Sequence, residues 1–304
     1  MRRQDPERHC GVVRSGAELS CGRSGPSRAH PEREMTMDLG RLSLWLCAAS
    51  LTAAAVSAAP AAFHHDLLDS VLTRRVNEAG GVDYVGLALE RDRLDRYVAD
   101  LATCSPRNCP ERFATGRDRL AYWINAYNAF VLRGVIDALP IHSVADVEGG
   151  LDGFFRKQRF VAGGDSLSLD DIENRIIRPQ FRDPRIHFAV NCGAASCPAL
   201  DRTAYGGADL DARLDRQALR FAADPAHVRW EKGHLHLSRI LDWYGEDFVK
   251  WYPTARAPVD GTPTLIDYLK LYAPADLLSR LTPGAGSSVE FNEYDWALNA
   301  RPSD

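Results

Sequence analysis

The sequence predicts an α+β fold, in which helices pack on a small, mostly antiparallel sheet within a single domain. Several stretches repeat their apolar residues at the spacing of a helix. Two shorter stretches alternate apolar and polar residues across glycine turns, as hairpins do. Of the 304 residues, 45% are hydrophobic and 26% are charged, which is enough apolar material for a core. A thiol-hydrolase-like fold is one form that this class can take.

The first 58 residues are expected to lie outside a single domain that covers 59–304. Residues 1–36 show no helical or strand period, and we interpret them as a disordered leader or as sequence before a true start at Met35 or Met37. Residues 37–58 have a short basic start, an apolar middle and a small-residue exit, the order found in signal peptides. A retained membrane anchor is the alternative, but the apolar run is short and rich in alanine. The pattern predicts a periplasmic or secreted protein with no stable membrane anchor after cleavage.

The first half of the predicted domain is expected to be largely helical. Apolar periodicity predicts helices over 63–79, 86–102 and 118–139. The third of these is apolar on nearly all sides, so we expect it to be buried. Residues 158–169 alternate around a Gly-Gly-Asp turn and predict a hairpin. Ser168 followed by Asp171 has the spacing of a capping box, which predicts a helix that Pro179 ends.

The second half mixes short strands with helices. The pattern predicts a strand over 186–190, a helix over 209–222, a hairpin over 228–237, a helix from Ser238 through Lys250, a helix opened by Thr262-Pro263, and a strand at the end of 289–298. Aromatic residues at helical spacing are interpreted as core: Trp243, Tyr244, Phe248, Trp251 and Tyr252.

The charge balance excludes one large class of partner. Lys and Arg total 37 against 41 Asp and Glu, giving a net charge of -4. Binding to nucleic acid requires basic residues that neutralise phosphates, so no nucleic-acid partner is expected. No cofactor is expected either.

The segment over 186–198 carries the densest chemistry. Cys192 follows the predicted strand, and a thiolate there needs a nearby base, for which His187 is the candidate. Gly193 lets a ligand approach the main chain. In a regular strand, a spacing of five residues points His187 and Cys192 to opposite faces. Their pairing therefore requires the chain to bend after Val190.

Four cysteines lie in the predicted domain, in two pairs with four residues between partners. Export favours disulfides, and we expect one between Cys104 and Cys109. A bond between Cys192 and Cys197 stays open as an alternative, and it would leave no free thiolate. Zinc held by the four cysteines is another alternative, but the spacing is wider than that of a zinc knuckle. No metal site is predicted.

Three polar side chains on predicted helices could belong to the same site. Glu173 could orient His187, or it could be a solvated carboxylate or the partner of a nearby arginine. Asn125 and Asn128 lie in the apolar helix over 118–139, where a buried amide must be hydrogen-bonded. They are therefore either clamps on a neighbouring loop or polar contacts in a cleft.

Four blocks of this sequence, from about residue 80 to 300, resemble those of the domain-of-unknown-function family 547 (DUF547) and follow one another in that family's order. They are Trp123–Ala129, His187–Pro198, Leu237–Phe248 and Tyr294–Asn299. The resemblance implies a fold and a site but no established activity. The family's recurrent polar positions correspond here to Asn125, Asn128, Glu173, His187, Cys192, Ser196 and Cys197.

The leading hypothesis is a thiol-dependent hydrolase or acyl transferase that acts on an amide or ester of a small-molecule or peptide-like substrate. Cys192 would be the nucleophile, His187 the base and Glu173 the residue that orients His187. Ser196 and the backbone N–H groups of 193–196 would bind the developing oxyanion. The expected substrate contacts are Asn125, Asn128, Gly193 and Cys197.

Two other hypotheses remain open. In one, the protein is a non-catalytic periplasmic binding or interaction module, and a Cys192–Cys197 bond is a structural bridge. In the other, the two cysteines are a redox dithiol, although their spacing is wider than the C-x-x-C of redox motifs. The state of Cys192 separates the enzyme hypothesis from both.

Overall fold

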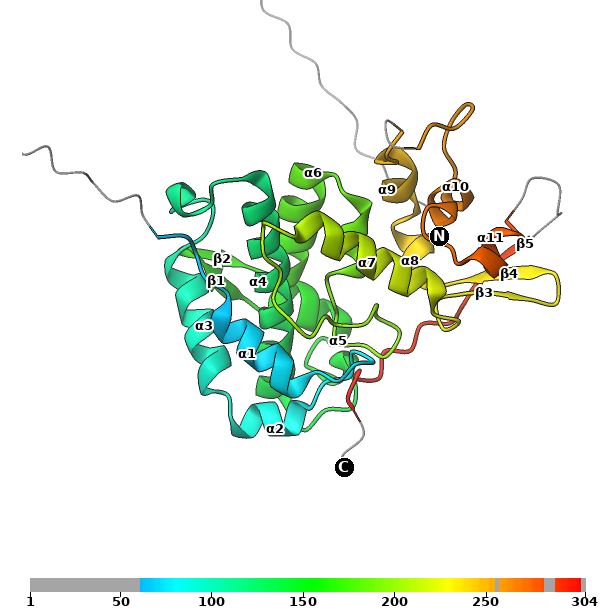
Figure 1. The fold of residues 1–304 in the computed structure, drawn as a ribbon. Coiled ribbons are helices and arrows are strands. Elements are labelled where there is room, and N and C mark those ends of the chain that lie inside the picture. The colour runs from blue at the N-terminus through cyan, green and yellow to red at the C-terminus, as the bar shows by residue number, and fades with distance from the viewer. Residues whose placement is uncertain (1–60, 255–256, 282–287, 302–304) are drawn as a thin grey trace, which may run out of the picture. The chain divides into compact units, whose positions relative to one another are not determined.

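A computed structural model describes residues 61–254, 257–281 and 288–301 (Figure 1). The predicted leader over 1–36 and the predicted signal peptide over 37–58 lie outside the described residues. Ser57–Asp304 form one compact unit. Among the described residues, no helix combines the length and the apolar character needed to cross a bilayer.

The structure confirms the α+β class. The α-helices are α1 (Asp66–Arg75), α2 (Tyr84–Leu89), α3 (Asp92–Thr103), α4 (Gly116–Ala138), α5 (Gly150–Asp152), α6 (Arg178–Phe181), α7 (Leu210–Ala223), α8 (Arg239–Trp243), α9 (Gly245–Lys250), α10 (Leu265–Lys270) and α11 (Ala275–Leu278). Short 3-10 or π-helical turns are η1 (Pro110–Arg112), η2 (Val144–Asp146), η3 (Gly153–Lys157), η4 (Asp171–Ile177) and η5 (Pro184–Phe188). The strands are β1 (Phe160–Ala162), β2 (Asp165–Leu167), β3 (Val228–Glu231), β4 (His234–Leu237) and β5 (Ser288–Phe291).

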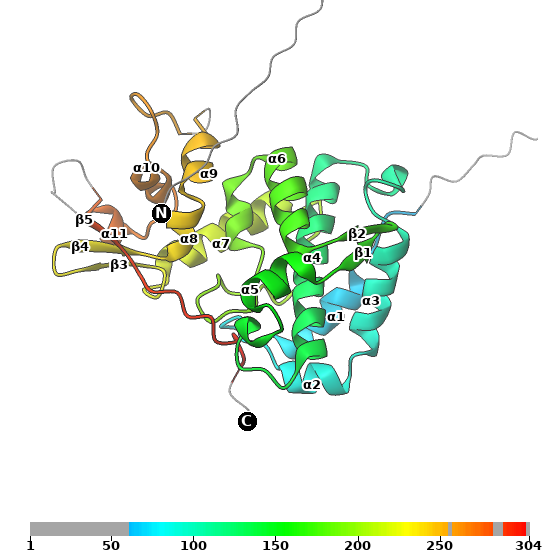
Figure 2. The ribbon, with the colours of Figure 1, turned by 180° about the vertical axis from the view of Figure 1, so that it is seen from behind.

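The described strands form two small sheets instead of one. β1 and β2 make an antiparallel hairpin. β3 and β4 pair antiparallel, and β5 adds to β4 in parallel, so that Leu235 lies opposite Val289. Figures 1 and 2 show this second sheet at the end of the unit away from α1, α2 and α3.

Helix α4 is the centre of the larger hydrophobic core. It begins at a capping box, in which Thr115 accepts from the backbone N–H of Asp118 and the Asp118 carboxylate accepts from that of Thr115. Sixteen of its residues are buried, as expected for a helix that is apolar all round. It packs against α2, α3 and η4 (Figure 2). A second core cluster joins α7 to the sheet of β3, β4 and β5 and to α8–α11.

Two helices that were predicted as continuous are each divided in the structure. The single helix predicted over 86–102 is two helices, α2 and α3, which meet at Glu90 and Arg91. The helix predicted to run from Ser238 through Lys250 is broken at Tyr244, between α8 and α9. Each break falls in a stretch whose apolar period continues, so the period alone did not reveal it.

Proline has a different role from the predicted one at two helices. Ser168 and Asp171 form the expected capping box. The chain stays helical past Pro179, however, because Pro179 lies in the first turn of α6, where the missing N–H of proline leaves no helical hydrogen bond unmade. The helix expected from Thr262-Pro263 is α10, which begins later, at Leu265, with Thr264 as its cap.

The strand predicted over 186–190 is instead the 3-10 helix η5. Pro184 opens it, and the Asp183 side chain accepts from the backbone N–H of Arg185 as an N-cap. A short apolar run fits a strand and a buried helical turn equally well, and the cap decides between them. This difference matters for the site, because His187 lies on η5.

The C-terminal segment holds the loop that follows η5. Ala195 N–H donates to Ala297 O at 2.7 Å, Ser196 N–H to Asp295 O at 3.2 Å, and Asn299 N–H to Gly193 O at 3.0 Å. These bonds join residues about a hundred positions apart. They bring the side chains of residues 294–296 next to Cys192 and Cys197.

Candidate functional site

A pocket of about 260 Å³ lies where η4, η5, α8 and the C-terminal segment meet. Four of the residues predicted for the site line it: Glu173, His187, Cys192 and Cys197. Its other lining residues are Tyr127, Phe155, Asp170, Asn174, Val190, Pro198, Ile240, Trp243, Tyr244, Tyr294 and Trp296.

The bend predicted to be necessary between His187 and Cys192 is present. The 3-10 turn of η5 and the loop after it replace the regular strand, in which the two side chains would diverge. His187 and Cys192 therefore line the same pocket.

Asp247 orients the His187 ring. His187 is 2% exposed, and its Nε2 lies 2.9 Å from Asp247 Oδ2. Because a carboxylate accepts the hydrogen on Nε2, the neutral ring has Nδ1 as its acceptor. The ring also stacks on Tyr244, with centroids 3.9 Å apart. These contacts hold the imidazole in one orientation.

Arg178 neutralises the Asp247 carboxylate. Its Nε and Nη2 donate to the two carboxylate oxygens at 2.6 and 3.0 Å, a bidentate pair. Burial opposes ionisation of Asp247, but the hydrogen bonds from His187 and Arg178 outweigh it and hold the pKa of Asp247 below its usual value. The hydrogen bond to Asp247 raises the pKa of Arg178. The two side chains form an ion pair behind the histidine.

Glu173 does not have the predicted role of orienting His187. Its Oε1 lies 3.9 Å from His187 Nδ1, beyond hydrogen-bond distance. Both atoms are buried and have no hydrogen-bond partner among the described residues. Burial and then the nearby Glu173 carboxylate raise the pKa of Tyr127 and of Tyr244. Glu173 thus places a carboxylate in the pocket that forms no ion pair with an arginine or lysine of the described residues.

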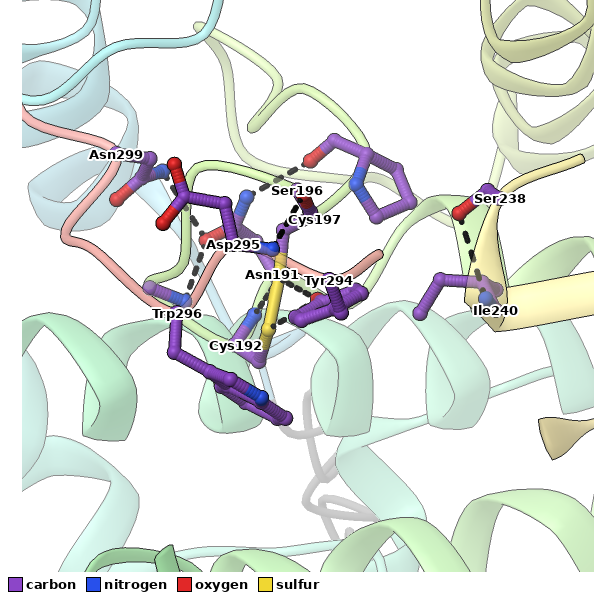
Figure 3. The surroundings of a disulfide bond; sticks show 12 residues. Asn191, Cys192, Ser196, Cys197, Ser238, Ile240, Tyr294, Asp295, Trp296 and Asn299 are labelled. Atoms are coloured by element: carbon purple, nitrogen blue, oxygen red, sulfur yellow. Dashed lines mark hydrogen bonds between the residues drawn. A yellow bond between two sulfur atoms is a disulfide. The ribbon is translucent and has the colours of Figure 1, made fainter. Parts of the chain in front are cut away.

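The sulfur atoms of Cys192 and Cys197 form a disulfide at the pocket, with Cα atoms 6.2 Å apart (Figure 3). The Tyr294 hydroxyl lies 3.0 Å from the sulfur of Cys192 and 3.2 Å from that of Cys197. The backbone N–H of Cys192 donates to Cys197 Sγ at 2.9 Å. In this form neither sulfur is a thiolate, so the predicted nucleophile requires reduction of the bond.

The expected Cys104–Cys109 disulfide is not present. Both residues are free thiols, with Cys104 buried. Burial and then the adjacent Cys109 raise the pKa of Cys104 to about 12, so its thiol stays protonated at neutral pH. Of the two C-x4-C pairs, the one at the pocket is oxidised.

Asn125 and Asn128 are clamps and do not line the pocket. Asn125 donates to Tyr205 O at 2.8 Å and accepts from Tyr205 N–H at 2.9 Å. Asn128 does the same across η5 and the cysteine loop, with Ala189 O at 3.0 Å and Asn191 N–H at 2.8 Å. Both ends of each amide are therefore occupied by backbone, and the predicted substrate contacts are not supported.

The predicted oxyanion donors are also in use elsewhere. The N–H of Gly193 donates to Asn191 Oδ1 at 2.9 Å. The N–H groups of Ala195 and Ser196 bond to the C-terminal segment. Ser196 Oγ accepts from the N–H of Asp295 and lines a neighbouring hollow instead of the pocket (Figure 3). The hydroxyl of Tyr294 is a side-chain donor that contacts both cysteine sulfurs, at 3.0 and 3.2 Å.

The sequence did not reveal the roles of three side chains at the site. Asp247 and Tyr294 lie in blocks that carried the family resemblance, but nothing in their spacing linked them to His187 or Cys192. Trp243 was interpreted as core, whereas it is 47% exposed and lines the pocket. Asp247 lies 60 residues after His187 along the chain, and Tyr294 lies 102 residues after Cys192. Only the folding of the chain brings these segments, and that of Trp243, to the site.

Comparison with known proteins finds a family match over part of the chain. Residues 112–222 match the family model described as "Protein of unknown function, DUF547". No curated protein and no solved structure matches the chain. The matched range contains Glu173, His187 and both pocket cysteines, whereas Asp247 and Tyr294 follow it. This match supports the resemblance of the chain to DUF547 domain-containing proteins.

Proposed function

We propose that the pocket is the active site of a thiol-dependent hydrolase or acyl transferase that acts on an amide or ester. The observation that supports this proposal most is that Cys192 and His187 line one pocket, with Asp247 bound to the far nitrogen of the ring. A thiol nucleophile, an imidazole base and a carboxylate that orients the base are the three parts that such chemistry uses. The proposed compartment, periplasmic or secreted, rests on the sequence of residues 37–58 alone.

The reaction begins with reduction of the Cys192–Cys197 disulfide by an external dithiol, which supplies two electrons and two protons and becomes a disulfide itself. The Cys192 thiol then gives its proton to Nδ1 of His187, and Asp247 stabilises the resulting imidazolium through Nε2. The thiolate attacks the substrate carbonyl carbon, and the imidazolium protonates the departing amine or alcohol. Water or an acceptor amine then cleaves the thioester and regenerates the thiol.

The disulfide itself favours a second candidate, a non-catalytic binding module. In that case the bond between Cys192 and Cys197 stays closed and fixes one wall of the pocket. Thiol counting under native conditions, with and without a mild dithiol, distinguishes the two functions. A bond that withstands reduction in the folded protein supports the binding module.

The enzyme proposal is tested with fluorescent iodoacetamide and with a p-nitrophenyl ester, each with and without a phosphine reductant. Labelling at Cys192, located by peptide mapping, and ester hydrolysis are both expected only after reduction. Cys192→Ala should abolish both, and His187→Ala should slow ester hydrolysis. Cys104→Ala is the matched control, because it removes a free thiol outside the pocket and should change neither.

Hydrolysis by Cys192→Ala at the rate of the unmodified protein would show that the sulfur is not the nucleophile. Rapid exchange of the reduced protein with oxidised glutathione, without any ester or amide turnover, would instead support the redox dithiol. Both results overturn the hydrolase proposal.

A further inference from the structure

The carboxylates around the pocket differ in their partners. Asp247 is neutralised by the bidentate contact from Arg178. Glu173 is 7% exposed, and its Oε1 has no hydrogen-bond partner among the described residues. Asp170, the other lining carboxylate, pairs with Arg156 at 3.3 Å. Glu173 forms no ion pair with an arginine or lysine among the described residues, and its nearest printed nitrogen is His187 Nδ1 at 3.9 Å. A buried carboxylate without a hydrogen-bonded cationic partner favours a cation that enters the pocket.

The walls of the pocket are suited to the same kind of ligand. Described aromatic residues surround it: Tyr127, Phe155, Trp243, Tyr244, Tyr294 and Trp296. Trp243 and Trp296 stack with centroids 5.9 Å apart, and Tyr294 lies 4.8 Å from Trp243. The described lining residues include no lysine and no arginine. Aromatic faces attract cations, and tryptophan does so most strongly.

The volume limits the size of the group. At about 30 Å³ for each water-sized atom, 260 Å³ holds roughly nine non-hydrogen atoms. A single alkylammonium side chain therefore fits in the pocket.

We infer that the pocket selects substrates that carry a small alkylammonium group, which Glu173 pairs with and the aromatic walls enclose. This inference rests on the proposed function, because only an enzyme has a substrate. The substrate class is amides or esters with an ammonium group a few bonds from the carbonyl. In this assignment Glu173 is a substrate-binding carboxylate, and Asp247 alone positions His187.

The test is equilibrium binding of three probes of equal length to the full-length protein in its disulfide form. The probes are n-butylammonium, n-butanol and n-butyrate, followed by tryptophan fluorescence and by calorimetry. The cation should bind about tenfold tighter than the alcohol, as expected for an ion pair with aromatic contact, and the anion should not bind.

Two variants and one control locate the effect. Glu173→Gln should remove the preference for the cation over the alcohol. Trp243→Ala should weaken cation binding severalfold, and its exposed position makes misfolding a small concern. Glu246→Gln makes the same chemical change at an exposed carboxylate outside the pocket and should leave binding unchanged.

Equal binding of cation and alcohol, or a preference that survives Glu173→Gln, overturns the inference. These measurements need no nucleophile, so they are separate from the test of the enzyme. If the cation preference is absent while Cys192-dependent hydrolysis is present, the inference fails and the enzyme stands. If the preference is present and Cys192→Ala hydrolyses normally, the enzyme fails and the ammonium site stands.

Discussion

Replacing Asp247 by asparagine should destabilise the protein by about 3 kcal/mol at pH 7. Asp247 is 4% exposed and accepts hydrogen bonds from His187 and from two nitrogens of Arg178. Removing one partner of a buried ion pair costs about 3–5 kcal/mol. We take the lower end because the Arg178 side chain is 28% exposed and solvent screens part of its charge. For a unit of this size the loss corresponds to a Tm lower by roughly 6–12 °C.

The pH dependence gives a second check on the same contact. The pKa of Asp247 is lower in the folded protein than in the unfolded chain, where it is about 3.9. Its ionised form therefore contributes stability above about pH 4, and this contribution is lost as the pH falls through the folded pKa. The gap between the native protein and Asp247→Asn should be full at pH 7 and should shrink below about pH 4.

Urea unfolding followed by circular dichroism measures both effects. Asp242→Asn is the matched control, because Asp242 is 41% exposed and, among the described residues, forms an ion pair with Arg239 in a surface i,i+3 contact. It should cost less than about 0.5 kcal/mol. An Asp247→Asn variant as stable as Asp242→Asn would refute the reasoning, since a buried charge pair and a surface pair would then contribute equally.

Three further outcomes are expected. Asn128→Ala should lower the free energy of unfolding by about 2–4 kcal/mol, because it leaves two buried backbone groups unpaired. A loss below about 0.5 kcal/mol, measured by urea titration, would contradict the role of Asn128 as a clamp. Gly193→Ala should lower the free energy of unfolding by about 1–3 kcal/mol, because φ is +81° at this position and an added Cβ would lie 3.3 Å from Val131. Unchanged thermal unfolding of this variant would contradict the expected strain. Alkylation of the denatured protein without reductant, followed by peptide mapping, should label Cys104 and Cys109 but not the pocket cysteines, whereas a cross-linked Cys104–Cys109 peptide would contradict the two free thiols.

Much of the fold followed from local pattern. The apolar period placed α4, and the glycine turns placed both hairpins. Local pattern failed where two structures share one pattern. The apolar run over 186–190 fits a strand or a helical turn, and the Asp183 cap with Pro184 made it a 3-10 helix.

The candidate site was predicted only in part. Residues close together in the sequence, His187, Cys192 and Cys197, were correctly expected near one another, because a short segment cannot separate them far. The roles given to Glu173 and Ser196 were not supported, because a role depends on which atoms come within about 3 Å, and spacing along the chain does not contain that distance.

The sequence alone determined the secondary structure elements that a local period or cap encodes. It also indicated the loop of Cys192 and Cys197 as part of the candidate site. Only the tertiary structure decided that Asp247, 60 residues away from His187, orients the imidazole, and that Tyr294, 102 residues away from Cys192, reaches its sulfur. It also decided that Cys192 is bonded to Cys197 while Cys104 and Cys109 are not. Hydrogen bonds, disulfides and ion pairs act over a few ångströms, so the partners of each side chain are fixed by how distant segments pack.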